Sequence, residues 1–271
     1  GFRLLDDDFM TKVFEDISCA ELLLRIILND EGIRVLEAHS QRGIKNLQGR
    51  SVKLDILAVD SHNRVFNVEV QRSDRGAGAK RARYNSALID ANVTEPGDQY
   101  EDLNETFVIF ITENDVMKAG LPIYHIDRVV RETGKLFEDE EHIIYVNSQI
   151  KDETKLGRLM HDFSCTDAKD MYNKVLADRV RYFKEDERGV EIMCREMEIM
   201  RNQAHEEGIE KGRIMQLIKQ VCVKMQKFSS AEEVANDLVE QDVPLIQKIM
   251  NVAPDFAPDY NVNDIYNALK L

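Results

Sequence analysis

The segments Val52–Asp60 (VKLDILAVD) and Arg64–Arg72 (RVFNVEVQR) decide the fold of this chain. Both are rich in branched or aromatic residues, and apolar residues alternate with polar ones over much of their length. This pattern predicts β-strands, and the short connection Ser61-His62-Asn63 predicts a turn between them. The sequence therefore indicates a β-hairpin.

The register of this hairpin brings acidic side chains together. If Asp60 pairs with Arg64 across the turn, counting back along both strands places Asp55 opposite Glu69. Two carboxylates in a cross-strand pair repel each other unless a cation lies between them. Gln71 follows Glu69 by two residues and so lies on the same strand face. The three side chains form a candidate site for a magnesium ion and a phosphodiester. Exposed strand acids, or acids paired with nearby arginines, are the alternative interpretation.

Charge is unevenly distributed around this pair. The whole chain carries a formal net charge of −14, which argues against a general polyanion-binding protein. From Arg42 to Arg83, however, ten basic residues accompany four acidic ones, a local charge of +6 that leaves −20 for the remainder. A basic surface around two carboxylates is what contact with a phosphate backbone requires. A chance cluster on a solvated face remains the alternative.

Other candidate site residues flank the hairpin. A helix is predicted from about Ala79 to Ala91, and a basic side chain on it could stabilise charge that develops on a phosphate. Arg83 is the candidate for that catalytic role, although a solvated helix face would give the same sequence. Glu21 is a candidate third metal ligand, but a capping box that starts at Ser18 explains it equally well. The candidate DNA contacts are Arg50, Lys53, Arg72, Lys80, Arg81 and Tyr84.

The order of elements predicts an α/β core followed by helices alone. Further strands are expected at Thr106–Thr112, Leu121–Val130 and His142–Val146, and only helical patterns follow from about Asp152. We therefore expect a core over residues 1–150 and a helical region over 151–271 that serves oligomerisation or partner binding. Its predicted helices include Gly189–Gly212 and Ile214–Lys227.

Several classes of protein are excluded by what the sequence lacks. No apolar run reaches membrane-spanning length, so no membrane association is expected. Gly76-Ala77-Gly78 lacks a following lysine at P-loop spacing, which argues against a nucleotide cofactor. The cysteines and histidines show no CxxC or HxxxH spacing, so a zinc site is not expected. With no apolar signal-peptide core near residue 1, a reducing cytoplasm is the expected location.

Three motifs resemble those of the PD-(D/E)XK nuclease-family transposases, also described as recombination-promoting nucleases. They are Gly49–Ile56 (GRSVKLDI), Asn67–Arg72 (NVEVQR) and Arg81–Tyr84 (RARY). The similarity extends over most of the first two hundred residues. It includes Leu5–Met10 (LDDDFM), Phe107–Thr112, His142–Asn147 and Gly157–Phe163 (GRLMHDF).

The resemblance implies a restriction-endonuclease-like core, in which helices flank a central mixed β-sheet, and metal-dependent DNA cleavage. By position, Asp55 corresponds to the motif aspartate, Glu69 to the motif acid and Gln71 to the motif lysine. Leu54 stands at the proline position. Because glutamine replaces lysine, as is usual in this subgroup, the positive charge is left to Lys80, Arg81 or Arg83.

Two functions follow from these expectations. The first is a Mg²⁺- or Mn²⁺-dependent endodeoxyribonuclease that acts on double-stranded DNA in transposition or recombination, as a homodimer. The second is a catalytically degenerate nuclease scaffold that acts in DNA binding or assembly, with the helical half as its working part. The missing lysine and the acidic net charge favour the second, whereas the carboxylate pair favours the first.

Overall fold

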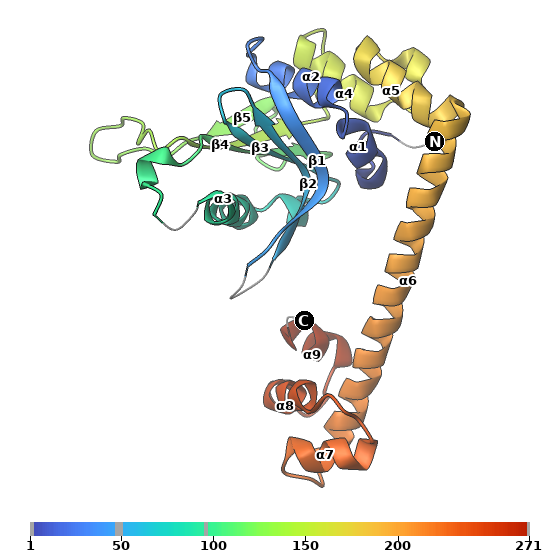
Figure 1. Ribbon diagram of the computed structural model, residues 1–271. Coiled ribbons are helices and arrows are strands. Elements are labelled where there is room, and N and C mark those ends of the chain that lie inside the picture. The colour runs from blue at the N-terminus through green and yellow to red at the C-terminus, as the bar shows by residue number, and fades with distance from the viewer. Residues whose placement is uncertain (1–2, 47–50, 95–96, 270–271) are drawn as a thin grey trace. The chain divides into compact units, whose positions relative to one another are not determined.

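The computed structural model describes residues 3–46, 51–94 and 97–269 (Figure 1). The chain forms two compact units, Gly1–Met193 and Cys194–Leu271. This division falls later than position 150, where the sequence patterns place it. The reason is that helices beyond that point contribute to the core of the first unit, through Leu159, Phe163 and Leu176.

Within the described residues, the first unit contains one sheet of six strands. Neighbouring strands follow the order β1-β2-β3-β4-β6-β5. The pairs β1–β2, β2–β3 and β5–β6 are antiparallel, whereas β3–β4 and β4–β6 are parallel, so the sheet is mixed, as expected. β5 is shorter than the strand expected at Leu121–Val130. The strands are β1 (Val35–Ile44), β2 (Val52–Asp60), β3 (Val65–Gln71), β4 (Thr106–Thr112), β5 (Ile123–Ile126) and β6 (Glu141–Asn147).

Helices cover both faces of this sheet. Figure 1 shows α1, α2, α4 and α5 on one face and α3 on the other. Because strand side chains alternate, Ile109 and Ile111 of β4 pack towards the first group, and Val108 and Phe110 pack on the side of α3. The helical elements of this unit are α1 (Asp7–Phe14), α2 (Ile17–Leu28), η1 (Asp74–Ala77), α3 (Ala79–Val93), η2 (Tyr100–Asp102), α4 (Lys155–Ser164), η3 (Ala168–Asp170), α5 (Lys174–Glu185) and the start of α6 (Glu187–Lys224).

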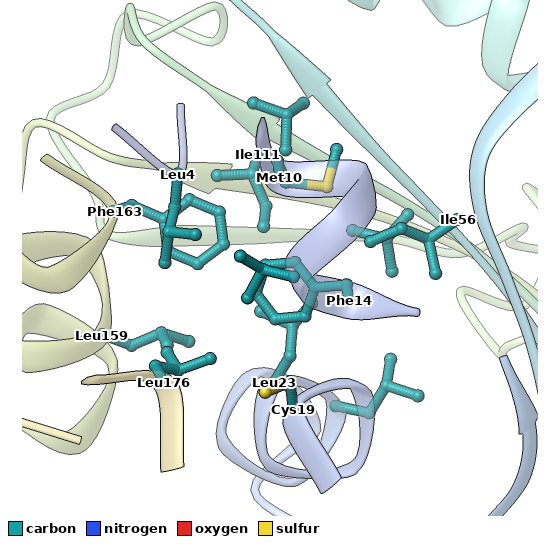
Figure 2. Packing of buried hydrophobic residues seen from close by; sticks show 14 of the residues in the cluster. Leu4, Met10, Phe14, Cys19, Leu23, Ile56, Ile111, Leu159, Phe163 and Leu176 are labelled. Atoms are coloured by element: carbon teal, nitrogen blue, oxygen red, sulfur yellow. The ribbon is translucent and has the colours of Figure 1, made fainter. Parts of the chain in front are cut away.

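The larger core lies between the sheet and the four-helix face. Figure 2 shows Phe14, Leu23 and Phe163 meeting at its centre. The rings of Phe14 and Phe163 stack with centroids 5.7 Å apart. Burying each such side chain stabilises the fold by about 1.5–3 kcal/mol. This packing anchors one face of β2 and β3, and their opposite face is left for contacts with α3.

The start of α2 differs from the expected capping box. Its N-cap is Asp16, whose side chain accepts hydrogen bonds from the backbone N–H groups of Ser18 and Cys19. Because the cap is Asp16 and not Ser18, the helix begins two residues earlier than expected, at Ile17. Glu21 is therefore not part of a capping box, and its carboxylate is used elsewhere.

The hairpin turn between β2 and β3 is closed by Asp60. Its Oδ1 accepts hydrogen bonds from the N–H groups of His62 at 3.0 Å and Arg64 at 2.9 Å. Asn63 adopts the left-handed conformation with φ of 64°, which asparagine tolerates better than most residues. The turn is thus specified by short polar side chains.

The second unit consists of helices and short connections, with no strand in its described residues, as expected. Its core gathers Ile218, Val221, Val234, Ile246 and Ile265 from four helices. The two helices expected at Gly189–Gly212 and Ile214–Lys227 form one continuous helix, α6, because Gly212 weakens the helix without ending it. The helices that follow are α7 (Ala231–Leu238), α8 (Val243–Val252), η4 (Ala253–Phe256) and α9 (Val262–Leu269). None of the helices in the described part of the chain is both long and apolar enough to cross a membrane.

Candidate active site

Backbone pairing between β2 and β3 stops just before the two acidic residues. The paired residues run from Val59↔Val65 to Ile56↔Val68. This register is the one predicted from the sequence, and continuing it by one residue puts Asp55 across from Glu69. The strands therefore separate at the point where the two carboxylates emerge.

Side chains take over the hydrogen bonds that the strand ladder loses at this point. The Asp55 N–H donates to Glu69 Oε1 at 3.2 Å, and the Val70 N–H donates to Asp55 Oδ2 at 3.1 Å. Asn67 Nδ2 donates to the Ile56 carbonyl at 3.3 Å. Each carboxylate is thus held by the backbone of the opposite strand. We call this point the strand fork: Asp55 and Ile56 on β2 with Asn67, Glu69 and Val70 on β3.

The other neighbour of β2 is also irregular beside Asp55. The β1–β2 register places Gln41 opposite Asp55, and Gln41 has a φ of 51°. The left-handed conformation costs roughly 1–2 kcal/mol for a residue other than glycine. Across this position β2 changes its orientation, because Ile56 packs in the four-helix core and Leu54 packs on the side of α3. The fork therefore coincides with a local distortion of the sheet.

Glu69 is fully buried, and both of its carboxylate oxygens accept hydrogen bonds. Oε1 accepts from Asn67 Nδ2 at 2.9 Å, in addition to the Asp55 N–H. Oε2 accepts from Arg81 Nη2 at 2.6 Å. A buried carboxylate is tolerated when it is paired and hydrogen-bonded in this way. Arg81 on α3 therefore compensates the charge of Glu69 directly.

Arg81 also holds the end of β3 and the η1 turn together. Its Nη1 donates to the Gly76 carbonyl at 3.0 Å and lies 3.5 Å from Gln71 Oε1. A Cβ at position 76 would lie 2.8 Å from Cδ of Gln71 and would overlap with its Oε1. Glycine at this position lets the turn pack directly against Gln71, so Glu69, Gln71 and Arg81 meet at one place.

Arg83, the candidate for stabilising charge that develops on a phosphate, lines a different part of the surface. Its side chain is exposed and lines a hollow of about 300 Å³ together with Lys80, Arg128 and Glu141. Two residues along a helix correspond to about 200° of rotation, so Arg81 and Arg83 face different directions. The basic side chain at the fork is Arg81, one of the three residues to which the motif leaves the positive charge. The catalytic role of Arg83 stays a prediction.

The remaining candidate DNA contacts are dispersed. Lys53 is exposed on β2. Arg72 is exposed but lies 3.5 Å from Asp6 and 3.4 Å from Glu113, so nearby acids partly neutralise it. Tyr84 is partly buried, and its hydroxyl accepts from Asn46 Nδ2 at 3.0 Å. The candidate at position 50 lies outside the described residues.

Glu21, the candidate third metal ligand, makes other contacts. Its Oε2 accepts the N–H of Val35 at 2.9 Å, and its Oε1 lies 2.7 Å from Arg25 Nη2. In the described part of the chain, one group of three His, Cys, Asp or Glu side chains brings its potential ligand atoms within 4.8 Å of one another, and neither Glu21 nor Asp55 belongs to it. The structure therefore gives Glu21 a place at the start of β1.

That group consists of His161, Asp162 and Cys165, and its acid has a structural task. Asp162 is fully buried and accepts hydrogen bonds from the N–H groups of Tyr172 at 2.7 Å and Asn173 at 2.9 Å. Its Oδ2 also accepts from Asn173 Nδ2 at 2.7 Å. Because three donors at the start of α5 already engage this carboxylate, we assign it to the junction between α4 and α5.

The sequence of this chain matches a known protein family. A family model described as PD-(D/E)XK nuclease family transposase matches residues 21–160, just over half of the 271 residues. The chain belongs to this family. No curated protein and no solved structure matches it significantly. The mixed sheet with flanking helices is consistent with the restriction-endonuclease-like fold, and membership implies a nuclease with a role in transposition.

Nucleases of the PD-(D/E)XK type typically use divalent metal ions, and the strand fork of this family member has suitable donors. Asp55, Glu69 and Gln71 offer hard oxygen atoms, which Mg²⁺ and Mn²⁺ prefer. Asp55 and Glu69 each carry a formal negative charge, and Arg81 pairs with Glu69. The residues present therefore fit a divalent metal site.

Sequence reasoning missed two residues at the strand fork, Asn67 and Asn85. Both have no exposed surface, and Asn85 Nδ2 on α3 donates to Asn67 Oδ1 at 3.1 Å. Asparagine is unfavourable inside a strand, where Asn67 lies, and inside a helix, where Asn85 lies. The presence of asparagine at two positions where secondary-structure propensity disfavours it was the sequence signal that could have identified them.

Proposed function

We propose that this PD-(D/E)XK transposase-family protein is a divalent-metal-dependent endonuclease that hydrolyses phosphodiester bonds of double-stranded DNA during transposition or recombination. The observation that carries the proposal is the strand fork, where Asp55 and Glu69 are each held by the opposite strand and Arg81 lies 2.6 Å from Glu69. Two neighbouring acids repel each other unless positive charge lies beside them, and a divalent metal ion would add to the charge that Arg81 supplies.

In this proposal Asp55 and Glu69 hold Mg²⁺ or Mn²⁺ through their carboxylate oxygens. When bound, such an ion supplies an activated water and polarises a phosphoryl oxygen. Glu69 is rigid because both oxygens are hydrogen-bonded and the side chain is fully buried. Asp55 is less buried and lies nearer to solvent, where it meets the substrate side of the site.

Arg81 supplies the positive charge that Gln71 lacks. An amide cannot carry charge, whereas a guanidinium is always protonated and stabilises charge that develops on a phosphate. The contacts of Arg81 to Glu69, Gln71 and Gly76 engage three of the five N–H donors of a guanidinium. Its side chain is 39% exposed, so part of it faces the surface that a phosphate would approach.

DNA contact by exposed basic residues is part of the same proposal. Lys53, Lys80 and Arg83 are exposed and belong to the segment with a local charge of +6. Contacts of this kind make affinity fall steeply with salt. Cleavage of both strands needs two active sites or two successive events, so we include a homodimer in the proposal, and sedimentation at micromolar concentration tests it.

The decisive experiment is metal-dependent nicking of a supercoiled plasmid by Asp55→Asn. Asparagine keeps an oxygen that can accept the Val70 N–H, so the variant is expected to fold. We expect a loss of about 10²-fold or more, because the charged metal ligand is gone. Glu37→Gln, an exposed acid on β1, is the matched control and should cleave like the parent chain. Undiminished nicking by folded Asp55→Asn would reject the proposal.

The degenerate scaffold remains the second candidate, and the glutamine at position 71 is the observation that favours it. It predicts that the chain binds DNA but takes up no metal at the fork. Titration with Mn²⁺ separates the two. Binding that is lost in Asp55→Asn supports the nuclease, and absence of binding in the parent chain supports the scaffold.

A further inference from the structure

Asn67 lies at the centre of the strand fork, and all of its amide atoms have partners. Nδ2 donates to the Ile56 carbonyl at 3.3 Å and to Glu69 Oε1 at 2.9 Å, while Oδ1 accepts from Asn85 Nδ2 at 3.1 Å. The reversed amide would place Oδ1 against two acceptors. The orientation of this buried amide is therefore set by its surroundings, and it is the donor end that faces Glu69.

Asn85 contributes a single hydrogen bond to this arrangement. Its Nδ2 donates to Asn67, whereas its buried Oδ1 has no hydrogen-bond partner among the described residues. Leaving a buried acceptor unpaired costs about 1–3 kcal/mol, which an apolar residue of similar size would avoid. The unpaired Oδ1 of Asn85 therefore destabilises the fold, while its Nδ2 supplies the hydrogen bond to Asn67.

The spacing of α3 and β3 explains how two asparagines meet here. Arg81 and Asn85 are one helical turn apart, which is roughly 6 Å along the axis of α3. Glu69 and Asn67 are two residues apart, which is roughly 6.6 Å along β3. Because these two spacings are nearly equal, Arg81 can bond to Glu69 while Asn85 bonds to Asn67. One further turn along, Leu88 and Val65 share an apolar cluster.

We propose that Asn67 and Asn85 are positioning residues for the metal-binding carboxylate. Asn85 fixes the amide of Asn67, and Asn67 in turn holds Glu69 Oε1 at the fork so that Glu69 faces Asp55 in one fixed orientation. Residues that orient a ligand in this way typically change metal affinity 10–100-fold when they are lost. The inference rests on the proposed function, since it requires that Glu69 binds a metal ion.

The test is Mn²⁺ binding, measured by electron paramagnetic resonance of the free ion at fixed pH, in folded variants of the full chain. Asn85→Asp keeps the size of the side chain but replaces the donor with an acceptor, which reverses Asn67 or sets two oxygens against each other. We expect Mn²⁺ affinity to fall about tenfold or more. Added negative charge alone would raise the affinity for a cation, so the sign of the change separates positioning from simple electrostatics.

A second variant and a control keep the result interpretable if Asn85→Asp unfolds. Asn85→Ala removes the donor without adding charge and should weaken Mn²⁺ binding severalfold. Ser86→Ala alters the adjacent buried polar residue, whose Oγ has no hydrogen-bond partner in the described structure, and should bind Mn²⁺ like the parent chain. In cleavage assays the Asn85 variants should need more metal for half-maximal rate, with the KM for DNA unchanged.

The outcomes separate this inference from the proposed function. Parental Mn²⁺ affinity in folded Asn85→Ala or Asn85→Asp overturns the positioning role and leaves the nuclease proposal standing. Failure of the parent chain to bind Mn²⁺, or binding that survives Asp55→Asn, overturns the proposed metal site and the positioning role with it. Weaker binding in both Asn85 variants, with Ser86→Ala unchanged, supports the inference.

Discussion

Arg81 and Glu69 form an ion pair in which Nη2 lies 2.6 Å from Oε2, although Glu69 has no exposed surface and Arg81 is partly open to solvent. The pair links α3 to β3 at the strand fork. It also decides which basic residue of α3 belongs to the site, since Lys80 and Arg83 line a separate hollow. The predictions that follow begin with this pair.

Arg81→Gln is expected to lower metal-dependent DNA cleavage by about 10²-fold, because a charged donor near the phosphate is lost. It should also destabilise the fold by about 2 kcal/mol, since hydrogen bonds to a charged group are broken. Arg131→Gln, which removes the same charge from an exposed position outside the basic segment, is the matched control. Plasmid nicking and urea unfolding measure both effects, and equal loss in the two variants would contradict the assignment to Arg81.

Gly76→Ala is expected to displace the side chain of Gln71, because the new Cβ would lie 2.8 Å from Cδ of Gln71. Gln71 is flexible and partly exposed, so we expect little change in stability and a clear drop in cleavage rate. Gly78→Ala is the comparison, since a Cβ there meets no atom within 4 Å. If Gly78→Ala reduces cleavage as much as Gly76→Ala, contact with Gln71 is not the cause.

Asp162→Ala should destabilise the first unit by about 3 kcal/mol or more. The substitution leaves three donors at the start of α5, from Tyr172 and Asn173, without their buried acceptor. Asp178→Asn on the exposed surface of α5 should change stability by less than about 0.5 kcal/mol. Denaturant unfolding followed by circular dichroism gives both values. Stabilisation of the parent chain, but not of Asp162→Ala, by added zinc would instead indicate that Asp162, His161 and Cys165 bind a metal ion.

Thiol labelling should distinguish the four cysteines. Burial raises the pKa of Cys19 to about 12, so at pH 8 its reactive thiolate is present in roughly one molecule in ten thousand. Burial also raises the pKa values of Cys165 and Cys222, whereas Cys194 is exposed. We expect an aromatic disulfide reagent to modify Cys194 first and Cys19 only as the first unit unfolds. Mass spectrometry identifies the sites, and early modification of Cys19 in folded protein would disagree with its burial.

Gly208→Ala and Gly212→Ala should each stabilise α6 by up to about 1 kcal/mol. Both glycines lie in the helix interior, where alanine is favoured, and a Cβ at either position meets no atom within 4 Å. Helical circular dichroism and the unfolding midpoint of the second unit should both rise. A decrease would mean that these positions are in close contact with another chain in solution.

The hairpin and its acidic pair could be predicted from the sequence because the information is local. Alternation over β2 and β3 fixed the element type, and the short turn fixed the register that brings Asp55 to Glu69. The family motifs led to the same residues. What local reasoning could not give is the separation of the strands at Asp55, which depends on side chains that replace backbone hydrogen bonds.

The choice of Arg81 over Arg83 needed the rotation of α3 about its axis. That rotation is set by Ala82, Asn85 and Ile89, which turn towards the sheet. The sequence does not reveal that Asn85 is buried, so from the sequence alone either Arg81 or Arg83 could face the hairpin. Glu21 shows the same limit, because its contact with Val35 depends on how β1 packs against α2. Long-range placement of helices on the sheet decided both cases.

The closed turn between β2 and β3 limits which insertions and deletions the gene can tolerate. Because side chains alternate along a strand, inserting or deleting one residue between Asp60 and Arg64 would turn Asp55 away from Glu69 and into the hydrophobic interior. Substitutions at Ser61 or His62, both exposed, leave that alignment intact. Substitutions at these two positions are therefore expected to be tolerated better than a change in the length of the connection, which would disturb the strand fork from a distance.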